Sequence, residues 1–194
     1  GAGAQSALKP LVDLPHLPKE GGIITGQDNE RIAWLFAVFR SFIRERNVLF
    51  AGKDFVSYNT SVPKDKRQPE IFLLVDGLTK AFLSDHEGFI QQLIEIIRGG
   101  RSAGIYIIIT ANLMQDIQVS TLLSDIPERV SLRQGMPELV KESVGGLPDA
   151  LKAKLEAGDC PPGRGFIKRQ AVLGMQVALP SDGQTEALRD NALC

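Results

Sequence analysis

The chain has 194 residues, of which 43% are hydrophobic and 23% are charged, and its formal net charge is -1. This composition is typical of a soluble domain that builds its own core. The near-zero charge argues against an overall attraction to nucleic acid, and no run approaches the roughly 20 apolar residues of a membrane span. Neither the two cysteines, Cys160 and Cys194, nor the two histidines have zinc-site spacing. We expect one reduced, cytosolic domain, and any membrane anchor would lie outside this chain.

The first 26 residues contain many glycines and prolines and predict irregular structure that leads into a short strand at Ile23 and Ile24. A long helix should follow. Asp28 is a suitable N-cap, and apolar residues recur at helical spacing from Ile32 onward. The arginines of this helix fall mostly on the other face, which we expect to be solvated or to contact a neighbour: Arg31, Arg40, Arg44 and Arg46.

Residues 51–69 predict a loop with one helical turn near Phe55 to Tyr58. The apolar run that follows, residues 71–77 (IFLLVDG), is typical of a parallel strand buried on both faces. Such a strand places Asp76 at its carboxyl end, where open α/β sheets bind ligands. In hydrolysing sites of this kind a glutamate usually comes next, but this chain has Gly77. The sequence therefore predicts an acid on the metal side without an evident general base.

A second strand is predicted after an intervening helix. The motif at residues 84–87 (SDHE) fits a capping box that starts this helix, and Gly99 and Gly100 would end it. His86 would then be a surface residue of the first turn. The next apolar run, residues 103–110, ends in Thr110-Ala111-Asn112. Strand, helix and strand form a βαβ unit, so Asp76 and Asn112 should lie at the same edge of the sheet.

The remaining third of the chain predicts shorter elements. Val130 and Leu132 alternate with polar residues as a strand, and Pro137 can start a helix that Gly145 and Gly146 end. Residues 148–156 suggest another helical turn or two. Residues 164–169 and 173–179 predict an antiparallel hairpin, and the polar residues after Pro180 predict a linker or tail.

Four residues are candidates for a nucleotide site. Asp76 could serve the metal, and Asn112 could contact a phosphate or simply form a turn. Arg101 and Arg129 could each act as an arginine finger on a neighbouring subunit, although structural ion pairing is the commoner role. The phosphate loop motif G-x-x-x-x-G-K-[ST] does not occur in the chain. These residues alone predict half of a nucleotide-binding α/β domain.

Seven segments carry a resemblance through their order: residues 14–16 (LPH), 31–50, 73–77 (LLVDG), 100–105 (GRSAGI), 110–112 (TAN), 126–129 (IPER) and 161–165 (PPGRG). Together they resemble the FtsK/SpoIIIE family of ring ATPases, and within it the motor ATPase of type VII (ESX-type) secretion systems. The similarity extends to about Pro180. It implies a RecA-like P-loop NTPase core with a parallel central sheet, ATP with Mg²⁺, hexameric assembly, and export of helical-hairpin substrates that carry a C-terminal signal.

The resemblance also implies roles for single residues. Asp76 matches the Walker B aspartate, which holds Mg²⁺ through water, and Asn112 matches the polar sensor position. Arg101 matches the arginine of the family's Gly-Arg-x-x-Gly-Ile segment. Two departures follow: Gly77 replaces the catalytic glutamate, and the Walker A loop, its helix and a strand should precede Gly1. Residues 1–180 would thus be a partial domain, or one that has lost its phosphate loop, and residues 181–194 a tail.

We expect such a chain to bind nucleotide poorly by itself and to expose a strand edge that a neighbouring domain or subunit covers. The favoured function is a degenerate ATPase module of a type VII secretion motor at the cytoplasmic face of the bacterial membrane. Two alternatives remain: an FtsK-like DNA translocase domain, which the charge disfavours, and a non-catalytic module that binds a helical export signal.

Overall fold

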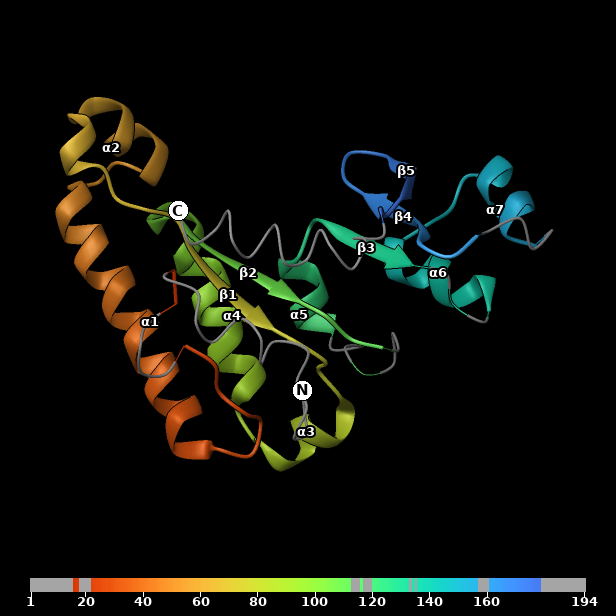
Figure 1. Ribbon diagram of the computed structural model, residues 1–194, viewed down its shortest axis with the longest axis horizontal. Helices are drawn as coiled ribbons and strands as arrows, with labels where there is room; N and C mark the ends of the chain where they lie inside the picture. The colour runs from red at the N-terminus through yellow and green to blue at the C-terminus, as the bar shows by residue number, and fades with distance from the viewer. Residues whose placement is uncertain are drawn as a thin grey trace, which may run out of the picture. The chain divides into compact units, whose positions relative to one another are not determined.

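The computed structural model describes residues 16–17, 22–112, 116, 120–132, 134, 136–156 and 161–178 (Figure 1). Their contacts divide the chain into two compact units, Gly1–Ile117 and Gln118–Cys194. The predicted tail at residues 181–194 lies outside the described residues, and the predicted single domain over residues 1–180 stays a prediction. Among the described helices, none combines the length and the apolar character needed to cross a membrane.

The first unit begins with the long helix α1, Asn29–Phe50, as predicted. The Asp28 carboxylate caps it by accepting a hydrogen bond from the Arg31 amide at 3.0 Å. The helix buries Phe36, Phe39 and Phe50. The predicted strand at Ile23 and Ile24 is wrong, because the chain forms bends here and enters a turn that the Asp28 amide closes on the Thr25 carbonyl.

Helix α2, Phe55–Ser61, and the 3-10 turn η2, Lys64–Lys66, follow α1. The predicted helical turn at Phe55 is confirmed and continues for a second turn. Asp54 caps α2 through the Ser57 amide at 2.8 Å. The Tyr58 ring stacks on Phe50 with ring centroids 4.5 Å apart, which fixes α2 against the end of α1.

Two strands, β1 (Ile71–Val75) and β2 (Ile105–Ile109), pair in parallel, with Ile71 opposite Ile105 and Val75 opposite Ile109. Between them the chain forms α3 (Lys80–Asp85), α4 (Phe89–Gly100) and the 3-10 turn η3 (Arg101–Ala103). Helix α4 packs against both α1 and β2, and Figure 1 shows α1 and α4 beside the strands. The predicted βαβ unit is therefore confirmed.

The predicted capping box at residues 84–87 is wrong. Thr79 caps α3 instead, with its hydroxyl accepting from the Phe82 amide at 3.2 Å, and Ser84 lies within α3. Gly88, with φ of 80°, interrupts the helical conformation between α3 and α4, so that α4 starts at Phe89. His86 accordingly follows the end of α3, where its Nδ1 lies 2.8 Å from the Phe82 carbonyl oxygen.

The prediction that the first strand is buried on both faces is also wrong. Leu73 and Ile105 are 8% and 2% exposed, but Phe72, Leu74 and Ile108 are about half exposed, at 52%, 51% and 49%. Successive side chains of a strand point to opposite faces, so one face of this sheet is packed and the other is open. An unbroken apolar run therefore does not by itself show that both faces are covered.

The second unit contains α5 (Ser120–Asp125), β3 (Arg129–Leu132), α6 (Pro137–Val144), α7 (Asp149–Glu156), β4 (Arg164–Lys168) and β5 (Val172–Gln176). The predicted hairpin of β4 and β5 is confirmed, and β3 pairs antiparallel with β4 to make a three-stranded sheet. The core of the second unit packs α6 and α7 against one face of this sheet. Its buried residues are Val140, Val144, Leu155 and Phe166. The fold is thus mixed α/β, with one parallel and one antiparallel sheet.

Candidate functional site

The candidate site lies at the carboxyl end of the parallel sheet, where Asp76 follows β1 and Thr110 follows β2. The strand register continues by one residue and places these two side by side. The Thr110 hydroxyl donates to Asp76 Oδ1 at 2.7 Å. The Asp76 side chain is partly exposed and Thr110 is exposed, so a ligand can approach this carboxylate.

Gly77 turns the chain directly after the acid. Its φ of 68° lies in the left-handed region, which costs other residues roughly 1–2 kcal/mol. The Gly77 amide donates to the Thr110 hydroxyl oxygen at 2.9 Å. Position 77 is therefore held in a backbone conformation that favours glycine.

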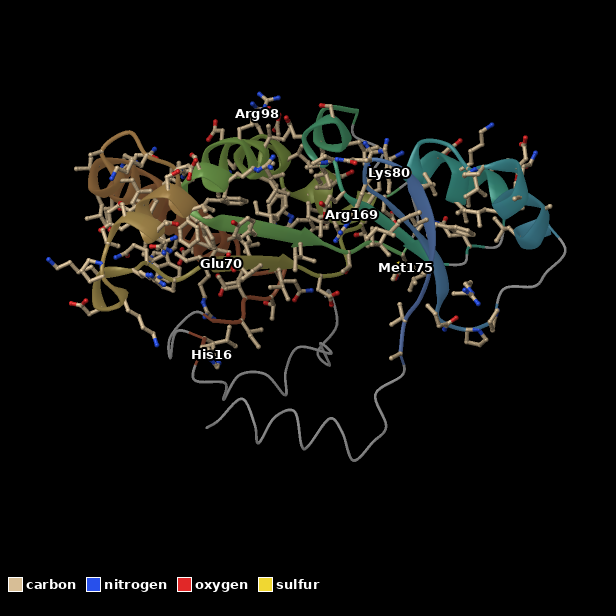
Figure 2. The ribbon with its side chains drawn as sticks, turned by 90° about the horizontal axis from the view of Figure 1, so that it is seen from above. His16, Glu70, Lys80, Arg98, Arg169 and Met175 are labelled. Carbon is tan, nitrogen blue, oxygen red and sulfur yellow. The ribbon has the colours of Figure 1, made fainter. Side chains whose placement is uncertain are left out.

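The loop that follows is fixed at several points before α3 begins. Leu78 is buried, with its amide 2.9 Å from the Thr110 carbonyl oxygen. The Lys80 amide donates to Asp116 Oδ1 at 3.1 Å. In Figure 2 the labelled Glu70 and Lys80 mark the ends of the segment that contains β1 and this loop. The loop is thus anchored at two points after the acid.

Asn112 lies at the same end of the sheet as Asp76, as the βαβ unit requires, and it is exposed two residues beyond Thr110. Sequence reasoning selected Asn112 and missed Thr110. The signal was present, because the apolar runs 71–75 and 105–109 have equal length. Aligning them in register places Asp76 opposite Thr110.

Arg101 lies at the other end of the sheet. It is the first residue of η3, before β2, and it is exposed. A strand of this length spans roughly 15 Å at about 3.3 Å per residue, so the side chain starts far from the Asp76 of its own chain. Any contact of Arg101 with a nucleotide would have to be made on a neighbouring subunit, which stays a prediction.

Arg129 is held inside its own unit. Its guanidinium donates to the carbonyl oxygens of Leu123 at 2.6 Å, Ile126 at 3.1 Å and Ser143 at 3.5 Å. Two of these acceptors lie near the carboxyl ends of α5 and α6, where a positive charge is favourable. This geometry favours the structural role over the finger role.

Arg46 was predicted to lie on a solvated face, but it is only 6% exposed. Its guanidinium donates to the carbonyl oxygens of Ala103 and Pro69, both at 2.7 Å. These acceptors lie just before β2 and β1. Burial lowers the pKa of Arg46, but the guanidinium remains charged at neutral pH. The side chain turns inward because the strand starts leave carbonyl oxygens that need donors.

The oxygen atoms of the side chains at the Asp76 end of the sheet are suitable ligands for Mg²⁺, which prefers carboxylate, hydroxyl and water oxygens. Within the part of the chain that the structure describes, no group of three His, Cys, Asp or Glu side chains gathers for a metal ion. An Mg²⁺ near Asp76 would therefore take further ligands from phosphate and water, as nucleotide-bound magnesium does.

No protein-family model matches the chain, and no curated protein matches it. Several solved structures do. The cytoplasmic domain of the Thermomonospora curvata type VII secretion ATPase EccC matches with a TM-score of 0.65 and 16% identity, over 82% of this chain and 19% of that one. ATPases 2 and 3 of EssC from Geobacillus thermodenitrificans match with a TM-score of 0.67 and 20% identity, over 86% and 31%.

A third structure, the pCW3 conjugation coupling protein TcpA in monomer form with ATPγS, matches with a TM-score of 0.58 and 18% identity, over 84% of this chain and 49% of that one. The chain therefore has the mixed α/β fold of FtsK/SpoIIIE-like P-loop ATPase domains. It is similar in structure to the ATPase domains of EccC and EssC, and it spans less than half of the length of each of these structures.

Proposed function

We propose that this chain is an ATPase-type module of a type VII protein secretion motor whose nucleotide site is degenerate. The observation that carries the proposal is the position of Asp76. It follows a parallel strand, contacts the end of the neighbouring strand, and belongs to a fold shared with EccC and EssC. An acid in this position is suited to the cation of a bound nucleotide.

The expected ligands are ATP and Mg²⁺. Asp76 would hold the cation through water, and Asn112 would lie toward the phosphates. When bound, Mg²⁺ neutralises and orients the phosphate oxygens. The phosphate loop motif does not occur in the sequence, so the backbone amides that usually surround phosphate are missing. We therefore expect this chain alone to bind nucleotide weakly.

Hydrolysis should be slow because Gly77 has no side chain to activate water. Loss of a general base typically costs 10²- to 10⁴-fold in rate. The left-handed backbone at Gly77 also means that Gly77→Glu would be strained. We expect Gly77→Glu to leave hydrolysis at its low level because of this strain. A large increase in rate would instead show that the missing glutamate alone limits hydrolysis and that the backbone at position 77 accommodates it.

The proposed partners are neighbouring ATPase domains or subunits of the same motor, with Arg101 as the residue that faces them. The open face of the parallel sheet, with Phe72, Leu74 and Ile108, is consistent with a covering partner. The motor would work at the cytoplasmic face of the bacterial membrane. Helical-hairpin proteins with a C-terminal signal would be the substrates.

Calorimetry with this chain tests the proposal. Titrations of ATPγS with Mg²⁺ should show weak binding, which Asp76→Ala abolishes. Asp65→Ala, which changes an exposed acid on η2, is the control and should bind like the wild type. No binding by the wild-type chain, or equal binding by Asp76→Ala, would contradict the nucleotide site. Rapid hydrolysis of ATP by the wild type would contradict the proposal that the nucleotide site is degenerate.

Two solved structures motivate alternatives. One neighbour is EccC, ATPases 2 and 3, in complex with a signal sequence peptide, at a TM-score of 0.57 and 20% identity. If this chain binds a helical signal peptide but no nucleotide, a pure interaction module is favoured. The coupling protein TcpA motivates the DNA translocase, which would require duplex binding that falls steeply with salt. The net charge of -1 argues against that outcome.

A further inference from the structure

Thr110 uses each of its polar groups on the four residues that end β1 and begin the next loop. Its amide donates to the Val75 carbonyl at 2.9 Å, and its carbonyl accepts from the Leu78 amide at 2.9 Å. Its hydroxyl donates to Asp76 Oδ1 and accepts from the Gly77 amide. The first two bonds involve only backbone atoms, but the last two require a side-chain hydroxyl.

A hydroxyl is suited to this position because it donates and accepts at the same time. As a donor to a carboxylate it makes a charge-assisted bond, which is short and strong and fixes the plane of the carboxylate. As an acceptor it holds the turn at Gly77 that directs the chain away from the acid. The orientation of Asp76 therefore depends on a side chain of the neighbouring strand.

We propose that Thr110 is the positioning residue of Asp76, and that its hydroxyl holds the Asp76 carboxylate in the orientation that serves the divalent cation of a bound nucleotide. The inference rests on the proposed function. It differs from the role expected of Asn112, because Thr110 acts through the carboxylate and not on the phosphates. The contribution of Thr110 to overall stability should be small, since its side chain is exposed and the backbone pairs remain without the hydroxyl.

The test uses the change Thr110→Val, which keeps the branched shape and both backbone bonds but removes the hydroxyl. Thr110→Ser restores a hydroxyl. Thr60→Val is the matched control, because Thr60 is an exposed threonine on α2 whose hydroxyl donates only to the local carbonyl of Val56. Thermal unfolding of each variant, followed by the fluorescence of Trp34, checks that the first unit is folded.

The measurement is the affinity of the whole chain for a fluorescent ATP analogue, in excess Mg²⁺ and in EDTA. The ratio of the two affinities reports the part of binding that depends on the cation. We expect Thr110→Val to lower this ratio about tenfold, which corresponds to one hydrogen bond to a charged group. Thr110→Ser and Thr60→Val should stay within about twofold of the wild type.

A double-mutant comparison shows whether Thr110 acts through Asp76. Asp76→Asn should lose most of the cation-dependent gain, and adding Thr110→Val to it should have no further effect. An unchanged ratio in Thr110→Val would overturn the inference, whether the two affinities stay the same or fall equally in Mg²⁺ and in EDTA. If the affinity of the wild type for the ATP analogue does not rise with Mg²⁺, the proposed function fails. That outcome is distinct from failure of the role proposed for Thr110.

Should Thr110→Val unfold, Thr110→Cys replaces it, since a thiol is a weaker donor than a hydroxyl. Its ratio should then fall below that of Thr110→Ser. Equal ratios for these two variants would overturn the inference.

Discussion

At the start of the parallel sheet, Arg46 reaches inward from α1 and donates to the carbonyl oxygens of Pro69 and Ala103, just before β1 and β2. At the other end, the exposed Thr110 hydroxyl joins the Asp76 carboxylate to the Gly77 amide. Both groups tie β1 to β2 through hydrogen bonds. They differ in burial, because Arg46 is almost fully enclosed whereas a solute can reach Asp76.

This difference separates a structural role from a functional one. A buried cation is costly to desolvate, so it is retained only where its donors are satisfied, and it cannot serve a ligand. An accessible carboxylate that accepts from the exposed Thr110 hydroxyl keeps the capacity to meet a cation. We therefore expect loss of the Arg46 guanidinium to reduce stability, and loss of the Asp76 carboxylate or of the Thr110 hydroxyl to reduce ligand binding.

The largest effect should come from Arg46→Ala. Removing the guanidinium leaves the buried carbonyl oxygen of Ala103 and the partly buried one of Pro69 without this donor, and we expect a loss of about 3 kcal/mol in the free energy of unfolding. Urea denaturation followed at Trp34, the only tryptophan of the chain, measures it. The control Arg44→Ala, at an exposed position of the same helix, should change stability by less than about 0.5 kcal/mol. Equal effects of the two changes would contradict a structural role for Arg46.

Gly77→Ala should come next, with a loss of about 1.5 kcal/mol, because alanine is disfavoured at a φ of 68°. Gly77→Asn should cost less, since asparagine tolerates the left-handed region better. The same urea titration distinguishes them. A neutral Gly77→Ala would mean that the turn after the acid is not held in this conformation in solution.

Thr79→Ala removes the cap of α3 and should cost about 1 kcal/mol. The control Ser84→Ala removes a hydroxyl that donates to the Lys80 carbonyl inside the same helix, and it should cost less than about 0.5 kcal/mol. Amide hydrogen exchange at Phe82 should accelerate in Thr79→Ala but not in the control. Faster exchange in both variants would show that the cap is not the feature that holds α3.

The smallest effect concerns Asp54, the cap of α2. The backbone amide of Ser57, followed by its side chain, donates to the carboxylate and lowers the pKa of Asp54 below its ordinary 3.8. The stabilisation is therefore complete above the ordinary pKa and is lost as the pH falls through the lowered one. The stability difference between wild type and Asp54→Asn should shrink as the pH falls below 3.8 and through the lowered pKa. A constant difference would contradict this linkage.

Local sequence signals predicted much of the fold. Asp28 marked the start of α1, Gly145 the end of α6, and two apolar runs separated by a helical segment gave the parallel pair that carries Asp76. Cap assignment failed at residues 84–87, because Thr79 and Gly88 outweigh the serine and glutamate there. The pairing of β3 with β4 was not predicted, since the partner of a short strand depends on contacts distant in the sequence.

The sequence by itself determined that Asp76 follows an apolar strand and that a glycine, Gly77, comes directly after this acid, because both are properties of consecutive residues. Only the tertiary structure decided that Thr110 is the hydroxyl beside Asp76, that Arg46 turns inward, and that Arg129 is engaged by carbonyl oxygens of its own unit. The physical reason is that a polar side chain bonds to whichever partners folding brings near it, and the partners of Thr110 and Arg46 lie more than 20 residues away in the chain.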